Sequence, residues 1–264
     1  MNAEEEYEGP ENDGKVIAIA SGKGGTGKTI SALNLGMALH ELDKHALVID
    51  SDLEDPNIGV NLGIYSPQIT INDVLEKEKN LIEALYIHES GLRVVPASLS
   101  INYLNPKVRA LSDIVKSMDG YVLLDCGPGL NNNLLNTLEV ADSVVAITNP
   151  IRSSISGTMR LIEIARDMGK DIEGIIVNNI TSKESSIEEI ENLTGCDVLG
   201  EVPYDKNVDQ STVNKIPLVK YKPHSPAATA FRKICHNMLD IEYNRTLSDR
   251  LKSSYHNFRD LLGF

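Results

Sequence analysis

Short apolar segments alternate with helical periodicities along most of the chain. Between the apolar segments, stretches such as 29–42 and 154–169 repeat apolar residues with the period of an α-helix. Continuous apolar strands that alternate with helices are typical of a parallel sheet buried on both faces. The pattern predicts an α/β fold, with a doubly wound, mostly parallel sheet and helices on both faces in three layers. The predicted strands are 16–20, 46–50, 92–97, 121–125, 143–148, 172–179 and 196–203.

The length and the two ends of the chain narrow the class of protein. A chain of 264 residues suits one α/β domain, which we place at 15–245. No segment approaches the ~18 uninterrupted apolar residues of a membrane span, and the N-terminus is acidic where a secretory signal would be basic and then apolar. We therefore expect a cytoplasmic protein. Residues 1–14 are acidic and poor in apolar side chains, which predicts a disordered tail.

Charge and cysteine content argue against several functions. The net charge is −13, and removing the six acidic residues of the first 14 still leaves −7. Sequence-independent DNA binding needs a basic surface that displaces counterions, so this acidity disfavours DNA as a partner. Cys126, Cys196 and Cys235 are widely spaced and form no C-x-x-C pair, which indicates neither a disulfide framework nor a metal site. We expect all three to be reduced core residues.

Ligands of such sheets bind at the carboxyl ends of the strands, so the loops after Ala20, Ile49, Leu124, Thr148 and Val177 are where we expect chemistry. The first of these loops fits the phosphate-binding pattern GxxxxGK[ST], between a predicted strand and a predicted helix. Its glycines let backbone N–H groups surround phosphate oxygens, while the second lysine meets the β and γ phosphates and the last hydroxyl meets Mg²⁺. A glycine-rich turn without a ligand is the alternative. The loop comprises Gly22, Lys23, Gly24, Gly25, Thr26, Gly27, Lys28 and Thr29.

Lys23 is one lysine more than such a loop needs. The sequence KGGTGKT resembles the deviant Walker A loop of the MinD/ParA ATPases, in which this extra lysine is a signature. The resemblance implies an ATP-dependent homodimer in which Lys23 reaches the phosphates of the ATP bound by the partner. A second cation there would neutralise charge that develops during phosphoryl transfer and would make hydrolysis depend on dimerisation. A lysine that points into solvent is the alternative.

The second strand ends in IDSDLEDPN, which brings several carboxylates to the phosphate site. The resemblance assigns to Asp52 the positioning or activation of the attacking water, and to its neighbours a switch that responds to the γ-phosphate. For Asp50 we expect a structural role or a contact with Mg²⁺ through water. Residues 55–57 fit a plain turn with a helix cap equally well.

The segment YVLLDCGPGL resembles the Mg²⁺-binding strand end of the same family, in the pattern DxxxG. The resemblance implies that Asp125 joins Thr29 at the Mg²⁺ site and that Gly129 lies near the γ-phosphate. Cys126, Gly127 and Pro128 replace the Ser-Pro-Ala common in MinD proteins, which leaves the details of this second switch open.

The resemblance extends over about residues 15–240, with the phosphate loop its most specific part. Asn178 and the loop with Pro203 and Asp205 match the places where the family contacts adenine, although both also suit ordinary connections in this fold. Residues 148–150 read TNP as in MinD proteins, but Ile151 stands where an acidic residue often follows, so a partner contact should differ.

The last segment has an apolar face, with Leu247, Leu251, Tyr255, Phe258 and Leu261 at helical spacing. MinD proteins end in a short amphipathic helix that lies on the membrane surface. The resemblance therefore implies that a helix over 246–264 places the protein on the inner face of the cell membrane, through residues 247–262. Packing on the domain or on another chain is the alternative, and two aspartates dilute the basic side of this helix.

The resemblance implies a MinD-like ATPase that dimerises around ATP and Mg²⁺ and hydrolyses ATP slowly until an activating or cargo protein stimulates it. Its role would be spatial regulation of the cell-division site or of another polar structure. A ParA-type partitioning ATPase is disfavoured by the charge, and a metallocluster carrier by the lack of paired cysteines. A tyrosine kinase on the same loop usually ends in a tyrosine cluster, whereas only Tyr243 and Tyr255 lie near this end. A nucleotide-dependent scaffold without hydrolysis stays open.

Overall fold

The structure is a computed structural model that describes residues 14–100, 111–115, 118–181 and 186–243. The predicted acidic tail, apart from its last residue, and the predicted C-terminal helix lie outside the described residues.

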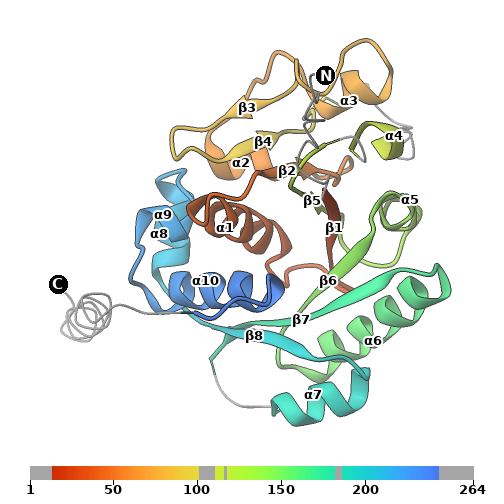
Figure 1. Ribbon diagram of the computed structural model, residues 1–264, viewed down its shortest axis with the longest axis vertical. Coiled ribbons are helices and arrows are strands. Elements are labelled where there is room, and N and C mark those ends of the chain that lie inside the picture. The colour runs from red at the N-terminus through yellow and green to blue at the C-terminus, as the bar shows by residue number, and fades with distance from the viewer. Residues whose placement is uncertain (1–13, 101–110, 116–117, 182–185, 244–264) are drawn as a thin grey trace, which may run out of the picture.

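A single sheet forms the centre of the described part of the chain (Figure 1). Its strand order is β3-β4-β2-β5-β1-β6-β7-β8, and every neighbouring pair is parallel except β3 with β4. All seven predicted strands are present, so the mostly parallel fold is confirmed. Sequence periodicity missed β3 because two residues are too few to show a period. The strands are β1 (Lys15–Ala20), β2 (Ala46–Asp50), β3 (Tyr86–Ile87), β4 (Arg93–Val95), β5 (Tyr121–Asp125), β6 (Ser143–Thr148), β7 (Asp171–Ile180) and β8 (Val198–Pro203).

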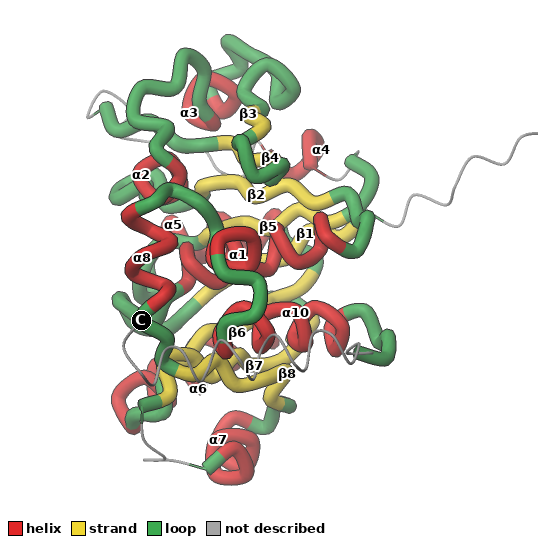
Figure 2. Tube along the Cα trace, turned by 90° about the vertical axis from the view of Figure 1, so that its left-hand side faces the viewer, coloured by secondary structure: helices red, strands yellow, loops and turns green. Residues whose placement is uncertain are grey.

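Helices cover both faces of this sheet, which makes the predicted three layers. The helices α1, α9 and α10 pack together on one face, whereas α5, α6 and α7 cover the other (Figure 1). Figure 2 shows α1 and α10 in front of the strands, on the same side of the sheet. The helices are α1 (Lys28–Glu41), α2 (Ile58–Leu62), α3 (Ile71–Leu75), α4 (Ser112–Val115), α5 (Asn132–Val140), α6 (Arg152–Asp167), α7 (Ile187–Thr194), α8 (Asn207–Val213), α9 (Leu218–Tyr221) and α10 (Pro226–Met238).

The central strand β1 shows why these strands are apolar at every position. Ile17 and Ile19 pack into the layer of α1 and α10, while Val16 and Ala18 pack into the layer of α5 and α6. Because successive side chains of a strand point to opposite faces, a strand covered on both faces has no solvent-facing position. Burial on both faces thus explains the continuous apolar pattern.

The prediction that the three cysteines are core residues is correct for two of them and only partly correct for Cys196, which packs at the margin of the core. Cys126 and Cys235 are buried free thiols, whereas Cys196 is only half-buried, at the loop before β8. Sequence reasoning treated all three alike because their spacing does not reveal burial.

The strand order indicates at which edge of the sheet a ligand would bind. The chain leaves β1 through α1 towards β2, and it leaves β5 through α5, on the opposite face, towards β6. The carboxyl ends of β1 and β5 therefore lie where the direction of winding reverses, which is where open α/β sheets bind ligands.

Within the described residues, every helix is too short or too polar to cross a membrane.

Candidate nucleotide-binding site

The loop between β1 and α1 is built to receive an anion. Lys28 is the first residue of α1, and the first turn of this helix carries no acidic residue that would oppose its positive end. Gly27 precedes it with a φ of 92°, in the left-handed region that favours glycine. A Cβ at Gly27 would overlap the side-chain amide of Asn178. The loop therefore has the backbone and the cation that phosphate binding requires.

The first half of the loop packs tightly on α6. A Cβ at Gly22 would overlap the backbone of Gly157, so two glycines let the loop and the helix touch. Lys23 is exposed at this edge, and its Nζ donates to the Ser153 hydroxyl at 2.8 Å. The side chain of Lys23 is thus held against α6 of its own chain and does not simply extend into solvent. That Lys23 reaches the phosphates bound by a second copy of the chain stays a prediction.

Asp125 has an environment that fits a cation. It is 0% exposed at the end of β5, and no donor in the described part of the chain makes a hydrogen bond to either carboxylate oxygen. Burial raises the pKa of Asp125 to about 7, although the nearby Thr29 hydroxyl and the Lys28 charge lower it. A buried, unpaired carboxylate is costly unless a positive charge balances it. Asp125 with the Thr29 hydroxyl beside it therefore suits Mg²⁺, a cation that prefers oxygen ligands.

We expect Asp125→Asn to raise the melting temperature of the nucleotide-free, Mg²⁺-free protein by roughly 5 °C or more at pH 8. The folded-state pKa lies above the ordinary value of 3.8, so the folded protein binds this proton more tightly than the unfolded chain. The cost of ionising Asp125 is absent below its unfolded pKa and grows as the pH rises towards the folded value. The stabilisation should therefore shrink towards pH 4, and thermal melts across this range would contradict the assignment if the gain were independent of pH.

Asp50 and Asp52 have different roles although both follow the same strand. The buried Asp50 carboxylate accepts hydrogen bonds from the backbone N–H groups of Asn57 (3.1 Å) and Ile58 (3.0 Å), and so caps the start of α2. Burial raises the pKa of Asp50, and the nearby Asp125 raises it further. Residues 55–57 form the turn that leads into α2, and the cap comes from Asp50 rather than from the side chain of Asn57. These contacts match the structural role expected for Asp50.

Asp52 lies between the phosphate loop and the segment after β5. It is 7% exposed, and its Oδ1 accepts the N–H of Asp55 at 3.1 Å. Burial raises the pKa of Asp52, while the Lys28 charge lowers it. A Cβ at Gly127 would lie only 3.1 Å from Asp52 Oδ1. Sequence reasoning singled out Gly129, which has a φ of 77° and open space around it, but it missed the contact of Gly127 with Asp52.

A cavity of about 230 Å³ opens beside the phosphate loop, and it gathers the residues predicted to contact adenine. Asn178 donates from Nδ2 to the Thr26 carbonyl at 2.8 Å, while Asn149 of the TNP segment donates to the Asn178 carbonyl at 3.0 Å. Asp205 accepts the N–H groups of Asn207 (2.9 Å) and Ala227 (3.2 Å). Both predicted side chains, Asn178 and Asp205, therefore hold backbone groups in place. The cavity wall combines apolar side chains with polar ones such as Asp209. Its lining includes Gly25, Thr26, Gly27, Ile30, Asn178, Pro203, Asp205, Val208 and Phe231.

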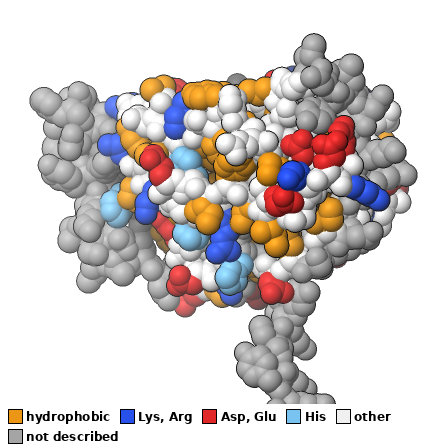
Figure 3. All heavy atoms as spheres, turned by 90° about the horizontal axis from the view of Figure 1, so that it is seen from above, with side chains coloured by type: hydrophobic (Ala, Val, Ile, Leu, Met, Phe, Trp, Pro, Cys, Tyr) orange, Lys and Arg blue, Asp and Glu red, His pale blue; other side chains and the backbone are white. Residues whose placement is uncertain are grey.

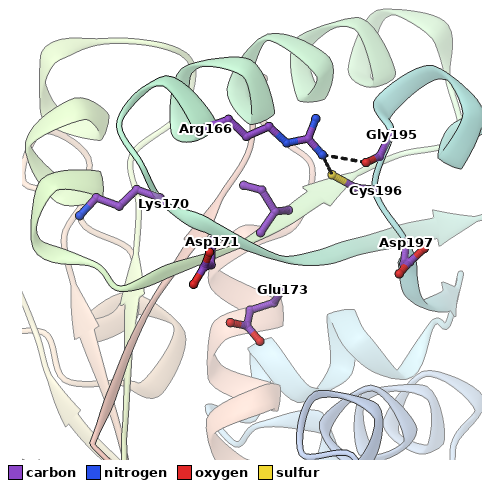
Figure 4. Close-up of a pocket in the computed structure, with 8 residues that line it drawn as sticks. Arg166, Lys170, Asp171, Glu173, Gly195, Cys196 and Asp197 are labelled. Carbon is purple, nitrogen blue, oxygen red and sulfur yellow. Dashed lines mark hydrogen bonds between the residues drawn. The ribbon is translucent and has the colours of Figure 1, made fainter.

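A second hollow, of about 340 Å³, lies at the opposite end of the sheet, where β7 begins (Figure 4). Arg166 donates to the Gly195 carbonyl at 2.7 Å and contacts Cys196 Sγ at 3.1 Å. Lys170 points away from Arg166 and donates to the carbonyls of Glu139 and Ala141. Since both cations already bind backbone carbonyls, this hollow does not offer the convergent donors of a phosphate site.

The fold and the site together define a P-loop nucleotide-binding protein. The family model of the CobQ/CobB/MinD/ParA nucleotide binding domain matches residues 17–218, and the chain belongs to this family. The predicted resemblance to MinD/ParA ATPases is thereby confirmed.

Named relatives and solved structures agree with this family. An uncharacterised ATP-binding protein of Methanocaldococcus jannaschii is 34% identical, over 90% of this chain and 92% of the relative. The crystal structure of the cell division ATPase MinD of Pyrococcus furiosus superposes with a TM-score of 0.82, at 31% identity over 86% of this chain and 99% of that one. The septum site-determining protein MinD of Pyrococcus horikoshii, solved with Mg-ADP, has a TM-score of 0.79 at 30% identity, over 84% and 94% of the chains.

Proposed function

We propose that this protein is a MinD-like ATPase that dimerises around ATP and acts as a spatial regulator of the division site or of another polar structure. It hydrolyses ATP slowly until an activating or cargo protein stimulates it. One observation carries the proposal: Lys28, Asp52 and the unpaired Asp125 meet at one edge of the sheet, beside a cavity that suits a purine. Phosphate binding, cation binding and water activation are thus available within one site.

ATP with Mg²⁺ is the cofactor that these residues fit. Lys28 and the loop N–H groups bind the β and γ phosphates, and the base enters the cavity lined by Asn178 and Pro203. Thr29 and Asp125 would hold Mg²⁺, which would neutralise charge on the phosphates during phosphoryl transfer. Asp52 would orient the attacking water. The relative solved with Mg-ADP supports this choice of cofactor.

The edge around Lys23 is suited to a second copy of the chain. Leu130 and Ile151 are exposed apolar residues in the loops beside the phosphate site, and Met159 is exposed on α6. Exposed apolar side chains of this kind are common at contact surfaces. A partner seated on this edge would meet Lys23, which could leave Ser153 and reach the partner's phosphates.

We place the protein in the cytoplasm, with a peripheral contact to the inner face of the cell membrane through residues 247–262. These residues lie outside the described part of the chain, so their sequence pattern alone supports the contact. DNA is disfavoured as a partner by the net charge of −13. On the face over α3 and β3, basic side chains are interspersed with acidic ones (Figure 3).

We expect Lys23→Ala to bind ATP with an affinity within about twofold of wild type, because Lys28 of the same chain holds the phosphates. The variant should stay monomeric with ATP and should lose about 100-fold in turnover, since the partner's site lacks its second cation. Size-exclusion chromatography and a phosphate-release assay measure the two effects. Lys44→Ala, which removes an exposed lysine beyond α1, is the matched control.

The same variant tests the membrane contact. One amphipathic helix binds weakly, whereas two helices on one dimer gain effective concentration. ATP-bound wild type should therefore sediment with anionic vesicles at low salt, while Lys23→Ala and a chain ending at Thr246 should not. Wild-type dimer that ignores the vesicles would refute the membrane contact and leave the ATPase proposal standing.

A further inference from the structure

Three consecutive asparagines at the start of α5 have three different environments. Asn131 precedes the helix and caps it, because its Oδ1 accepts the N–H of Leu134 at 2.9 Å. Asn132 is exposed. Asn133 reaches out of the helix, and its Nδ2 donates to the Ser51 carbonyl at 3.0 Å, in the loop after β2.

This hydrogen bond is the second of two that hold the backbone of Ser51, the residue directly before Asp52. On its other side, the Ser51 N–H donates to the Asp125 carbonyl at 2.9 Å. The N–H of Asp52 itself points to Asp50 Oδ1 at 3.3 Å. The backbone that carries Asp52 is therefore held by the end of β5 on one side and by the Asn133 side chain on the other.

The segment between Asp125 and Asn133 also touches the Asp52 carboxylate. A Cβ at Gly127 would lie 3.1 Å from Asp52 Oδ1 and 3.3 Å from Asn133 Nδ2. The carboxylate and the amide thus pack on the same glycine. A shift of the segment 127–133 would change the position of Asp52 through two contacts, the glycine surface and the amide hydrogen bond.

We propose that Asn133 is a positioning residue for Asp52, which links the segment after β5 to the carboxylate that orients the attacking water. The inference rests on the proposed ATPase function. Without the Asn133 donor, the Ser51 carbonyl loses its partner in α5, and the backbone directly before Asp52 loses the hydrogen bond that ties it to that helix. Since catalysis is sensitive to displacements of about 1 Å, turnover should fall while nucleotide contacts stay intact.

The test compares Asn133→Ala with Asn132→Ala, its exposed neighbour of the same residue type. We expect kcat to fall about tenfold or more in Asn133→Ala, with the ATP Kd from fluorescent-nucleotide titration unchanged within about twofold, and no effect in Asn132→Ala. Asn133→Leu keeps the number and branching of the side-chain heavy atoms but lacks a donor, and its kcat should fall as far as that of Asn133→Ala. Thermal melts check that each variant is folded.

A double-mutant cycle shows whether Asn133 acts through Asp52. In an Asp52→Ala background, adding Asn133→Ala should change the single-turnover rate by less than about twofold, because the group to be positioned is gone. Full wild-type turnover in Asn133→Leu, equal effects of Asn132→Ala and Asn133→Ala, or an additive loss in the double variant would each overturn the positioning role. Absence of turnover in wild type is a different result, since it would overturn the ATPase proposal itself.

Discussion

Replacing Lys28 by alanine is expected to reduce ATP affinity by about 100-fold or more, to below detection in a standard titration. Lys28 is 7% exposed at the first position of α1, so its ammonium is partly shielded from water. In the proposed arrangement it would lie close to the charge of the β and γ phosphates. It also lowers the pKa of both Asp52 and Asp125. Its removal would therefore leave bound phosphates facing two carboxylates without the central cation.

Isothermal titration with ATP and Mg²⁺ measures this loss, and Lys44→Ala should bind as wild type does. Circular dichroism confirms that the Lys28 variant keeps its fold. Near-normal ATP affinity in the folded variant would mean that the loop between β1 and α1 is not the phosphate site.

Asp52→Ala is expected to separate binding from turnover. ATP affinity should stay within about twofold of wild type, because Asp52 makes no phosphate contact in the proposed arrangement, while kcat should fall about 100- to 1,000-fold through the loss of water activation. ATP-bound dimers should then accumulate, because dimerisation still occurs and hydrolysis no longer ends it.

Phosphate release under saturating ATP gives the rate, and light scattering follows the dimer. Glu54→Ala is the matched control, since it removes an exposed carboxylate two residues away. If Asp52→Ala turned over ATP as fast as wild type, Asp52 would have no part in the reaction. Asn133 would then have no catalytic group to position. Turnover lost equally in Glu54→Ala would show that the charge of the whole loop, and not Asp52, matters.

The fold and the family's loop motif could be predicted because their information is local. Burial on both faces makes the strands continuously apolar, so each of the seven parallel-sheet strands is visible in a few consecutive residues. The loop of Gly22 to Thr29 is similarly contained in eight consecutive residues. The first turn of a helix and a left-handed glycine need only neighbours along the chain.

The antiparallel strand β3 and the environment of Cys196 escaped prediction for the opposite reason. A strand of two residues has no period of its own, and it exists only because β4 lies beside it. Cys196 contacts Arg166, which comes from the end of a helix 30 residues away in the chain. Neither position carries a pattern that distinguishes it within its own segment.

By itself, the sequence determined the class of fold, the phosphate loop and the acidic residues that follow β2 and β5, because each depends on residue type and spacing within one segment. Only the tertiary structure decided which side chains act together. It paired Lys23 with Ser153 and Gly22 with Gly157, and it selected Asn133 from three identical neighbours to reach Ser51. Which side chains make contact depends on how a helix is rotated and on how far it lies from a loop that follows another strand. The packing of the whole sheet determines both the rotation and the distance.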